Sequence, residues 1–170
     1  LCSDKLFVSA NNIVGKQNLS FSVVRYGNVF GSRGSVYNVF KNYKDKGFFP
    51  ITDHKMTRFN ITLDYATSMI QDVLKIAKGG EIFLLDMGEP VKINNLALKM
   101  ISLSGLQVRN QNNPDGDIEI KYTGLRPGEK LYEELLIGGN SSKTPNNMIM
   151  MANEKMIGWS MLEPILVELD

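Results

Sequence analysis

Cysteine, histidine and tryptophan are rare in this sequence, which has one residue of each type among 170. The single Cys2 cannot form an internal disulfide and has no partner at metal-ligand spacing, so we expect no metal site and a reducing compartment, by default the cytoplasm. We also expect Cys2 to be buried in a helix. His54 lies in a polar turn without a catalytic pattern around it, which predicts a solvated surface histidine.

Charge imbalance and long apolar runs are missing too. The 19 basic and 18 acidic side chains give a net charge of +1, which argues against nucleic acid as a partner and means that any anion site must be local. No apolar run approaches the ~20 residues of a membrane-spanning helix. We therefore expect membrane contact only through other parts of a longer parent protein, which could be anchored to the inner membrane.

What the sequence does contain is a regular alternation of helix-like and strand-like segments. Apolar spacing predicts helices over residues 1–14, 36–46, 62–77, 94–104 and 161–169. β-prone runs predict strands over residues 21–26, 50–53, 56–61, 81–85 and 118–123, and residues 107–116 and 138–147 have the composition of loops. Helices between strands favour an α/β fold with parallel strands. The low strand count leaves two alternatives, the carboxyl-terminal half of a larger protein or a small independent α/β domain.

The glycine-rich loop at residues 27–35 precedes a predicted helix and is the first candidate anion site. Glycines let main-chain N–H groups approach a ligand, and the first turn of a helix leaves such donors unpaired, which suits a phosphate. Arg33 would add a charge-assisted hydrogen bond. The alternative is that glycine and serine only turn the chain and cap the helix.

Arg58 is the second candidate, because it stands in an extended and mostly apolar segment between Met56 and Ile61. Such an arginine could project from a strand into a cleft, where its planar fork can hold a diphosphate. From the pattern alone, a surface arginine is the more common outcome.

The segment at residues 125–130 is the third candidate. Proline restricts one backbone angle and glycine frees another, so the segment can direct Arg126 and Glu129 at one ligand, the cation at phosphate and the carboxylate at ribose hydroxyls. A turn followed by the start of a helix would need no ligand. Glu133 and Glu134 are expected on that helix, where adjacent side chains diverge, and are not interpreted as a paired acid site.

Taken in order, these segments resemble the second half of the extended short-chain dehydrogenase/reductase family, specifically the UDP-N-acetylglucosamine 4,6-dehydratases of bacterial polysaccharide biosynthesis and flagellin glycosylation. The resemblance runs nearly end to end, and its most specific motif is Gly-Leu-Arg-Pro-Gly-Glu-Lys-Leu at residues 124–131. It implies an α/β fold that is the carboxyl-terminal part of a Rossmann-like fold. Residues 1–47 would end the Rossmann-like domain, and residues 48–170 would form mainly the substrate-binding subdomain, with some strands returning to the sheet.

The resemblance also implies a binding site for a UDP-sugar, in which residues from distant segments surround one ligand. The resemblance implies that Asn28 and the turn at Ser35 and Val36 contact the diphosphate, and that Arg58 and Arg126 clamp the phosphates. It further implies that Glu129 binds the ribose hydroxyls and that Pro50, Ile51 and Thr52 line the uridine side. Together with Arg33, these residues form the predicted site.

The implied reaction starts with hydride transfer from sugar C4 to NAD(P), continues with loss of water across C5 and C6, and ends with return of the hydride to C6, which yields a UDP-4-keto-6-deoxy sugar. The Gly-x-x-Gly-x-x-Gly fingerprint of the family is absent from the chain. The catalytic Tyr-x-x-x-Lys motif belongs just before the first helix. We therefore predict that this chain lacks that motif, contains no catalytic residue, does not hold NAD(P) by itself and is inactive alone.

Two other functions stay open from the sequence. One is another nucleotide-sugar epimerase or reductase of the same family, and the other is a non-catalytic nucleotide-binding or assembly module. The resemblance also implies a homo-oligomer formed partly through the apolar face of the helix at residues 1–14. Within that helix, Ser3, Asp4 and Lys5 are expected to form a solvated face.

Overall fold

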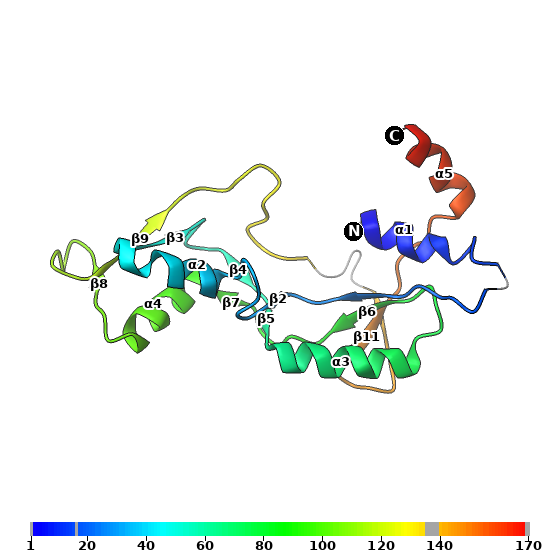
Figure 1. The fold of residues 1–170 in the computed structure, drawn as a ribbon, viewed down its shortest axis with the longest axis horizontal. Coiled ribbons are helices and arrows are strands. Elements are labelled where there is room, and N and C mark those ends of the chain that lie inside the picture. Colours follow the sequence, from blue (N-terminus) through cyan, green and yellow to red (C-terminus); the bar gives the residue numbers. More distant parts are fainter. Residues whose placement is uncertain (1, 16, 135–139, 169–170) are drawn as a thin grey trace. The chain divides into compact units, whose positions relative to one another are not determined.

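The computed structural model describes residues 2–15, 17–134 and 140–168 and has the predicted α/β class (Figure 1). Residues 1, 138, 139 and 169, which belong to predicted helices or to a predicted loop, lie outside the described residues. The chain forms two compact units. The first unit comprises residues 1–26, 66–86 and 134–170, and the second comprises residues 27–65 and 87–133. The boundary expected between residues 47 and 48 falls inside the second unit.

The first unit is built on a four-stranded sheet with the order β1-β6-β11-β10. Its strands are β1 (Val23–Arg25), β6 (Ile82–Leu85), β11 (Ile149–Ala152) and β10 (Ser141–Lys143). β1 is parallel to β6, and the β10–β11 hairpin continues the sheet antiparallel to β6. All four residues of β6 are buried, as expected for a central strand.

Helices complete this unit. Helix α3 (Leu63–Ile76) places Val73 against Phe83, Leu85 and Ile149 of the sheet. Helix α1 (Cys2–Ala10) packs beside helix α5 (Trp159–Glu168), as Figure 1 shows. The helix α3 begins where the sequence predicts, because the Thr62 hydroxyl accepts the Tyr65 N–H at 3.2 Å and so satisfies one unpaired donor of the first turn.

The second unit contains three small sheets, each with short strands. The parallel sheet has the order β3 (Phe48–Ile51), β9 (Ile118–Tyr122) and β8 (Val108–Arg109). The other pairs are β2 (Asn28–Val29) parallel to β5 (Asn60–Ile61), and β4 (Thr57–Arg58) antiparallel to β7 (Val91–Lys92).

The core of the second unit is formed by the helices α2 (Val36–Tyr43) and α4 (Ile93–Leu103) together with β3 and β9. Phe40 and Phe49 stack at its centre with ring centroids 4.6 Å apart and an interplanar angle of 7°. A short 3-10 turn, η1 (Lys44–Lys46), follows α2 and ends at Gly47, whose φ of 73° explains why glycine closes this helix.

Gly27 allows the close approach of two chain segments that the β2–β5 pair requires. A Cβ atom at this position would lie 2.5 Å from the carbonyl oxygen of Phe59. Because no side chain fits there, the Asn28 N–H can donate to the same carbonyl at 2.8 Å. The glycine-rich sequence therefore brings residue 28 beside the segment that carries Arg58.

A buried ionic cluster in the first unit corrects the expectation that Asp4 lies on a solvated face. Arg25 is 8% exposed and donates to Asp4 at 2.7 Å and to both carboxylate oxygens of Glu154. The hydrogen bond to Glu154 raises the pKa of Arg25 further, although burial alone would lower it. Asp4 is therefore a structural partner of the sheet.

Several other sequence predictions were wrong. Helix α1 ends at Ala10 and not at residue 14, and Cys2 is exposed. Strand β8 lies in the predicted 107–116 loop, and β10 lies in the predicted 138–147 loop. No helix forms over residues 124–134, where Glu133 and Glu134 were expected on one. The prediction for His54 is confirmed, since its side chain is 63% exposed.

Candidate functional site

A cavity of about 510 Å³ in the second unit brings together eight of the ten predicted site residues. They are Asn28, Val36, Pro50, Ile51, Thr52, Arg58, Arg126 and Glu129. The other two, Arg33 and Ser35, are not among the lining residues. Asn28, Arg58, Arg126 and Glu129 are therefore neighbours in space, although about a hundred residues separate the first from the last.

The amino-terminal end of α2 forms one wall. Val36, Val39 and Tyr43 lie on one face of this helix and line the cavity. Ser35 is the N-cap residue, with φ −60° and ψ 153°, but its hydroxyl caps no N–H group and is a buried oxygen without a hydrogen-bond partner. Main-chain donors of the first turn are thus available at the wall.

Arg33 belongs to the same loop but is exposed and lies outside the cavity lining. The loop is held by Asn38, whose side-chain amide donates to the carbonyls of Gly31 at 3.0 Å and Ser32 at 2.8 Å. These bonds fix the turn before α2 without involving the Arg33 side chain. The predicted charge-assisted contact from Arg33 to a ligand therefore stays a prediction.

Arg58 is 14% exposed, so it is not the surface arginine that the pattern alone favours. Its Nη1 donates to the carbonyls of Thr57 at 2.7 Å and Leu131 at 3.1 Å, and its Nη2 donates to the carbonyl of Lys130 at 2.7 Å. Its Nε lies 3.6 Å from Oε1 of Glu133. Three of the five N–H groups of the guanidinium are thus hydrogen-bonded, and the Nε–H is beside a carboxylate. The second hydrogen of Nη2 is left for a ligand.

The segment containing Arg126 and Glu129 forms the opposite wall. Glu129 accepts the Thr52 hydroxyl at 3.1 Å and the main-chain N–H of Arg126 at 3.2 Å. Its carboxylate is thereby directed along the cavity edge. The Arg126 side chain is exposed and makes no hydrogen bond or ion pair with any residue that the structure describes. Arg126 therefore retains its full set of donors for an anion.

Sequence reasoning missed Thr123 and two of the three lining positions on α2, Val39 and Tyr43. Thr123 follows β9, and its N–H donates to the carbonyl of Ile51 at 2.9 Å. β3 and β9 are parallel, so the residues after their carboxyl ends meet at one edge, where Thr52 also lies. The spacing of Val36, Val39 and Tyr43 could have revealed the helix face.

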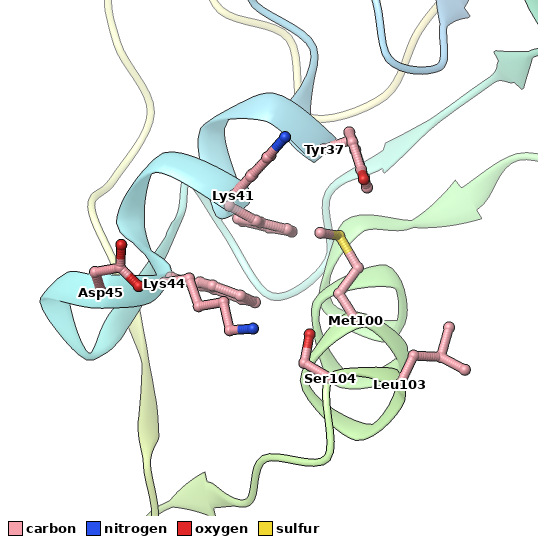
Figure 2. A pocket seen from close by; sticks show the side chains of 9 residues that line it. Tyr37, Lys41, Lys44, Asp45, Met100, Leu103 and Ser104 are labelled. Atoms are coloured by element: carbon pink, nitrogen blue, oxygen red, sulfur yellow. The ribbon is translucent and has the colours of Figure 1, made fainter.

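A second hollow of about 540 Å³ lies on the other face of α2, between this helix and α4 (Figure 2). Tyr37 and Lys41 line it and have the spacing Tyr-x-x-x-Lys, so the prediction that the chain lacks this pattern was wrong. No hydrogen bond between the two side chains is found in the described structure. The lysines around this hollow are exposed side chains, and it lacks the convergent acid and arginines of the first cavity.

The sequence has no Gly-x-x-Gly-x-x-Gly fingerprint, and the one strand–loop–helix unit with a glycine-rich loop, β2 to α2, directs its helix end into the first cavity. Among the described residues no group of three His, Cys, Asp or Glu side chains could hold a metal ion. None of the described helices combines the length and the hydropathy that crossing a bilayer requires.

Comparison with known proteins places this geometry in a family. The model of the family described as "Polysaccharide biosynthesis protein" matches residues 1–154, which is most of the chain. The chain belongs to this family. Membership confirms the predicted resemblance and, with the observed architecture, the assignment to part of an extended short-chain dehydrogenase fold.

Several known proteins share extensive sequence with the chain. The capsular polysaccharide biosynthesis protein CapD of Staphylococcus aureus is 48% identical over 69% of this chain and 18% of its own length. An inverting UDP-N-acetylglucosamine 4,6-dehydratase of Campylobacter jejuni is 40% identical over 85% of this chain and 39% of its own length. A UDP-glucose 4-epimerase of Rickettsia bellii is 30% identical over 82% of this chain and 38% of its own length.

A solved structure shows the same fold. The X-ray structure of Pen from Bacillus thuringiensis superposes with a TM-score of 0.73 at 31% identity, covering 98% of this chain and 54% of that protein. The chain thus spans about half of that structure and two fifths or less of the curated relatives described above.

Proposed function

We propose that this chain forms the nucleotide-sugar binding part of a UDP-N-acetylglucosamine 4,6-dehydratase, which makes a UDP-4-keto-6-deoxy sugar for bacterial surface glycans. The observation that carries the proposal is the convergence of Asn28, Arg58, Arg126 and Glu129 on one cavity. The greater identity to the Campylobacter dehydratase, 40% against 30% for the Rickettsia epimerase, supports a dehydratase over an epimerase.

In this proposal the diphosphate lies between the amino-terminal end of α2 and Arg126. The helix end supplies main-chain donors and a partial positive charge, and Arg126 supplies a guanidinium that has no other partner among the described residues. Arg58 adds one further hydrogen bond from its Nη2. Asn28, on β2, offers an amide that can donate to a phosphate or accept from the sugar.

Glu129 recognises the ribose, and Pro50, Ile51 and Thr52 form the uridine wall. A carboxylate accepts hydrogen bonds from two adjacent hydroxyls, and in the free protein Glu129 already accepts one such bond from the Thr52 hydroxyl. We assign NAD(P) and the residues that act on the sugar to the intact parent, and no catalytic residue to this chain.

A titration of the chain with UDP, followed by NMR, tests the proposed site. Since all the lining residues belong to one unit, we expect weak but saturable binding, with the largest shifts at Asn28, Arg58, Thr52 and Glu129. CDP is the control, because it has the same diphosphate and ribose and should bind less tightly if residues 50–52 recognise uracil. Shifts confined to residues outside the cavity would refute the site.

Another enzyme on a nucleotide sugar is the second candidate, favoured by the epimerase relative, and a non-catalytic binding module is the third. Mass spectrometry after incubation of the full-length parent with UDP-N-acetylglucosamine separates them. A dehydratase yields a product lighter by one water, an epimerase yields a product of unchanged mass, and a binding module yields no product.

A further inference from the structure

Glu133 joins two parts of the proposed site and is itself absent from the cavity lining. Its Oε2 accepts the main-chain N–H of Phe59 at 3.1 Å, and its Oε1 lies 3.6 Å from Nε of Arg58. Phe59 is the single residue between β4 and β5. One carboxylate thus ties the segment that follows Glu129 to the strands that carry Arg58.

Arg58 is held from the same side by main-chain groups. The carbonyls of Thr57, Lys130 and Leu131 each accept one hydrogen bond from its Nη atoms. In addition, the main-chain N–H of Thr57 donates to the carbonyl of Leu131 at 3.3 Å. These carbonyls hold only the two Nη atoms. The Nε atom of Arg58 lies 3.6 Å from Oε1 of Glu133, which is 24% exposed and therefore only partly screened by water.

On the basis of the proposed function, we infer that Glu133 is a positioning residue that holds Arg58 with its one free Nη2 hydrogen directed at the diphosphate. It also keeps the Arg126 and Glu129 segment in register with β4 and β5. Without Glu133, the Nε side of Arg58 and the Phe59 N–H lose their common partner. Arg58 can then shift within its carbonyl contacts, and part of the binding free energy is needed to restore its position.

The opposite role would be that of a simple counter-charge, and the two roles predict effects of opposite sign. A carboxylate close to a phosphate site repels the ligand and neutralises Arg58, so its loss would strengthen UDP binding. Loss of a positioning group would weaken it. The sign of one measured change therefore separates the two roles.

The test uses the complete chain with Glu133→Gln, which keeps an oxygen for the Phe59 N–H but removes the charge beside Arg58. Glu133→Asp keeps the charge but retracts the carboxylate by one methylene group. Glu89→Gln is the matched control, because Glu89 is an exposed acid in the same unit and outside the cavity. Thermal unfolding checks that each variant is folded.

Two measurements are made on each variant. The first is the NMR signal of the Arg58 Nε–H, which is assigned by its loss in Arg58→Lys. The second is the pair of dissociation constants for UDP and for uridine. We expect the Arg58 signal of the unaltered chain to exchange slowly and to move or broaden in Glu133→Gln and Glu133→Asp. Both variants should bind UDP about five- to tenfold more weakly, with uridine binding unchanged. Glu89→Gln should match the unaltered chain.

Equal or tighter UDP binding by Glu133→Gln would overturn the inference, as would normal binding by Glu133→Asp. If the unaltered chain binds no UDP, the proposed function of this chain fails, and the Arg58 signal alone decides the positioning role. An Arg58 signal that is the same in all variants would then show that Glu133 does not hold this side chain.

Discussion

The two units of this protein use their buried and partly buried charges differently. In the first unit, Arg25 has carboxylates on both sides, since Asp4 and Glu154 together satisfy its guanidinium. In the second unit, the side chain of Arg126 has no partner among the described residues, although it lines a cavity that also contains Glu129. A fully paired arginine stabilises a fold, whereas an unpaired one at a concave surface is available to a ligand.

The largest effect should come from breaking the paired arginine. Arg25→Met leaves Asp4 and Glu154 as buried carboxylates without a counter-ion, so we expect the free energy of unfolding to fall by about 3–5 kcal/mol. Urea unfolding followed by fluorescence of Trp159, the single tryptophan, measures this change within the first unit. A loss below about 1 kcal/mol would mean that water already screens the cluster.

Replacing the unpaired arginine should affect binding without affecting stability. Arg126→Gln removes a charge-assisted contact to phosphate, and we expect UDP affinity to fall by about ten- to a hundredfold with an unchanged unfolding midpoint. Arg33→Gln is the control, because Arg33 is also exposed and unpaired in the described structure but lies outside the cavity. If Arg33→Gln and Arg126→Gln lowered UDP affinity equally, the position of Arg126 in the cavity would not distinguish it from Arg33.

The smallest effect concerns pH and the first unit. Burial acts to raise the pKa of Glu81, but hydrogen bonds from Ser22 and from the N–H groups of Lys78 and Gly79 outweigh it and lower the pKa below the usual value. A lowered pKa means that the ionised form stabilises the fold above pH 4.5, and that this contribution is lost as the pH falls through the folded-state pKa.

Glu81→Gln should therefore make stability less dependent on pH in acid. Unfolding midpoints between about pH 3 and pH 7 would be compared for the two proteins, and the difference should be largest at neutral pH and shrink below pH 4.5. Parallel pH profiles would contradict the assignment of the shift to Glu81.

Much of this fold could be predicted because its longer elements have clear apolar periodicity. Helices α2, α3 and α4 and the strands β6 and β9 lie close to their predicted positions. The two-residue strands β2, β4, β5 and β7 were not predicted as separate elements, because each depends on a partner distant in sequence. Strand β8, which pairs with the nearby β9, lies in a segment whose polar composition indicates a loop. Residues 131–134 resemble a helix locally, but the main-chain carbonyls of Lys130 and Leu131 accept hydrogen bonds from Arg58.

The sequence by itself determined which segments carry suitable groups for a nucleotide sugar: a glycine-rich loop before a helix, an arginine in an apolar strand, and an Arg-Pro-Gly-Glu turn. Only the tertiary structure decided which of these groups face one cavity. It separates Arg126 from Arg33, although both are exposed arginines in turns, and it commits two donors of Arg58 to carbonyls of a segment about seventy residues away. The reason is that pairing and burial depend on neighbours in space, which residue type and local spacing do not specify.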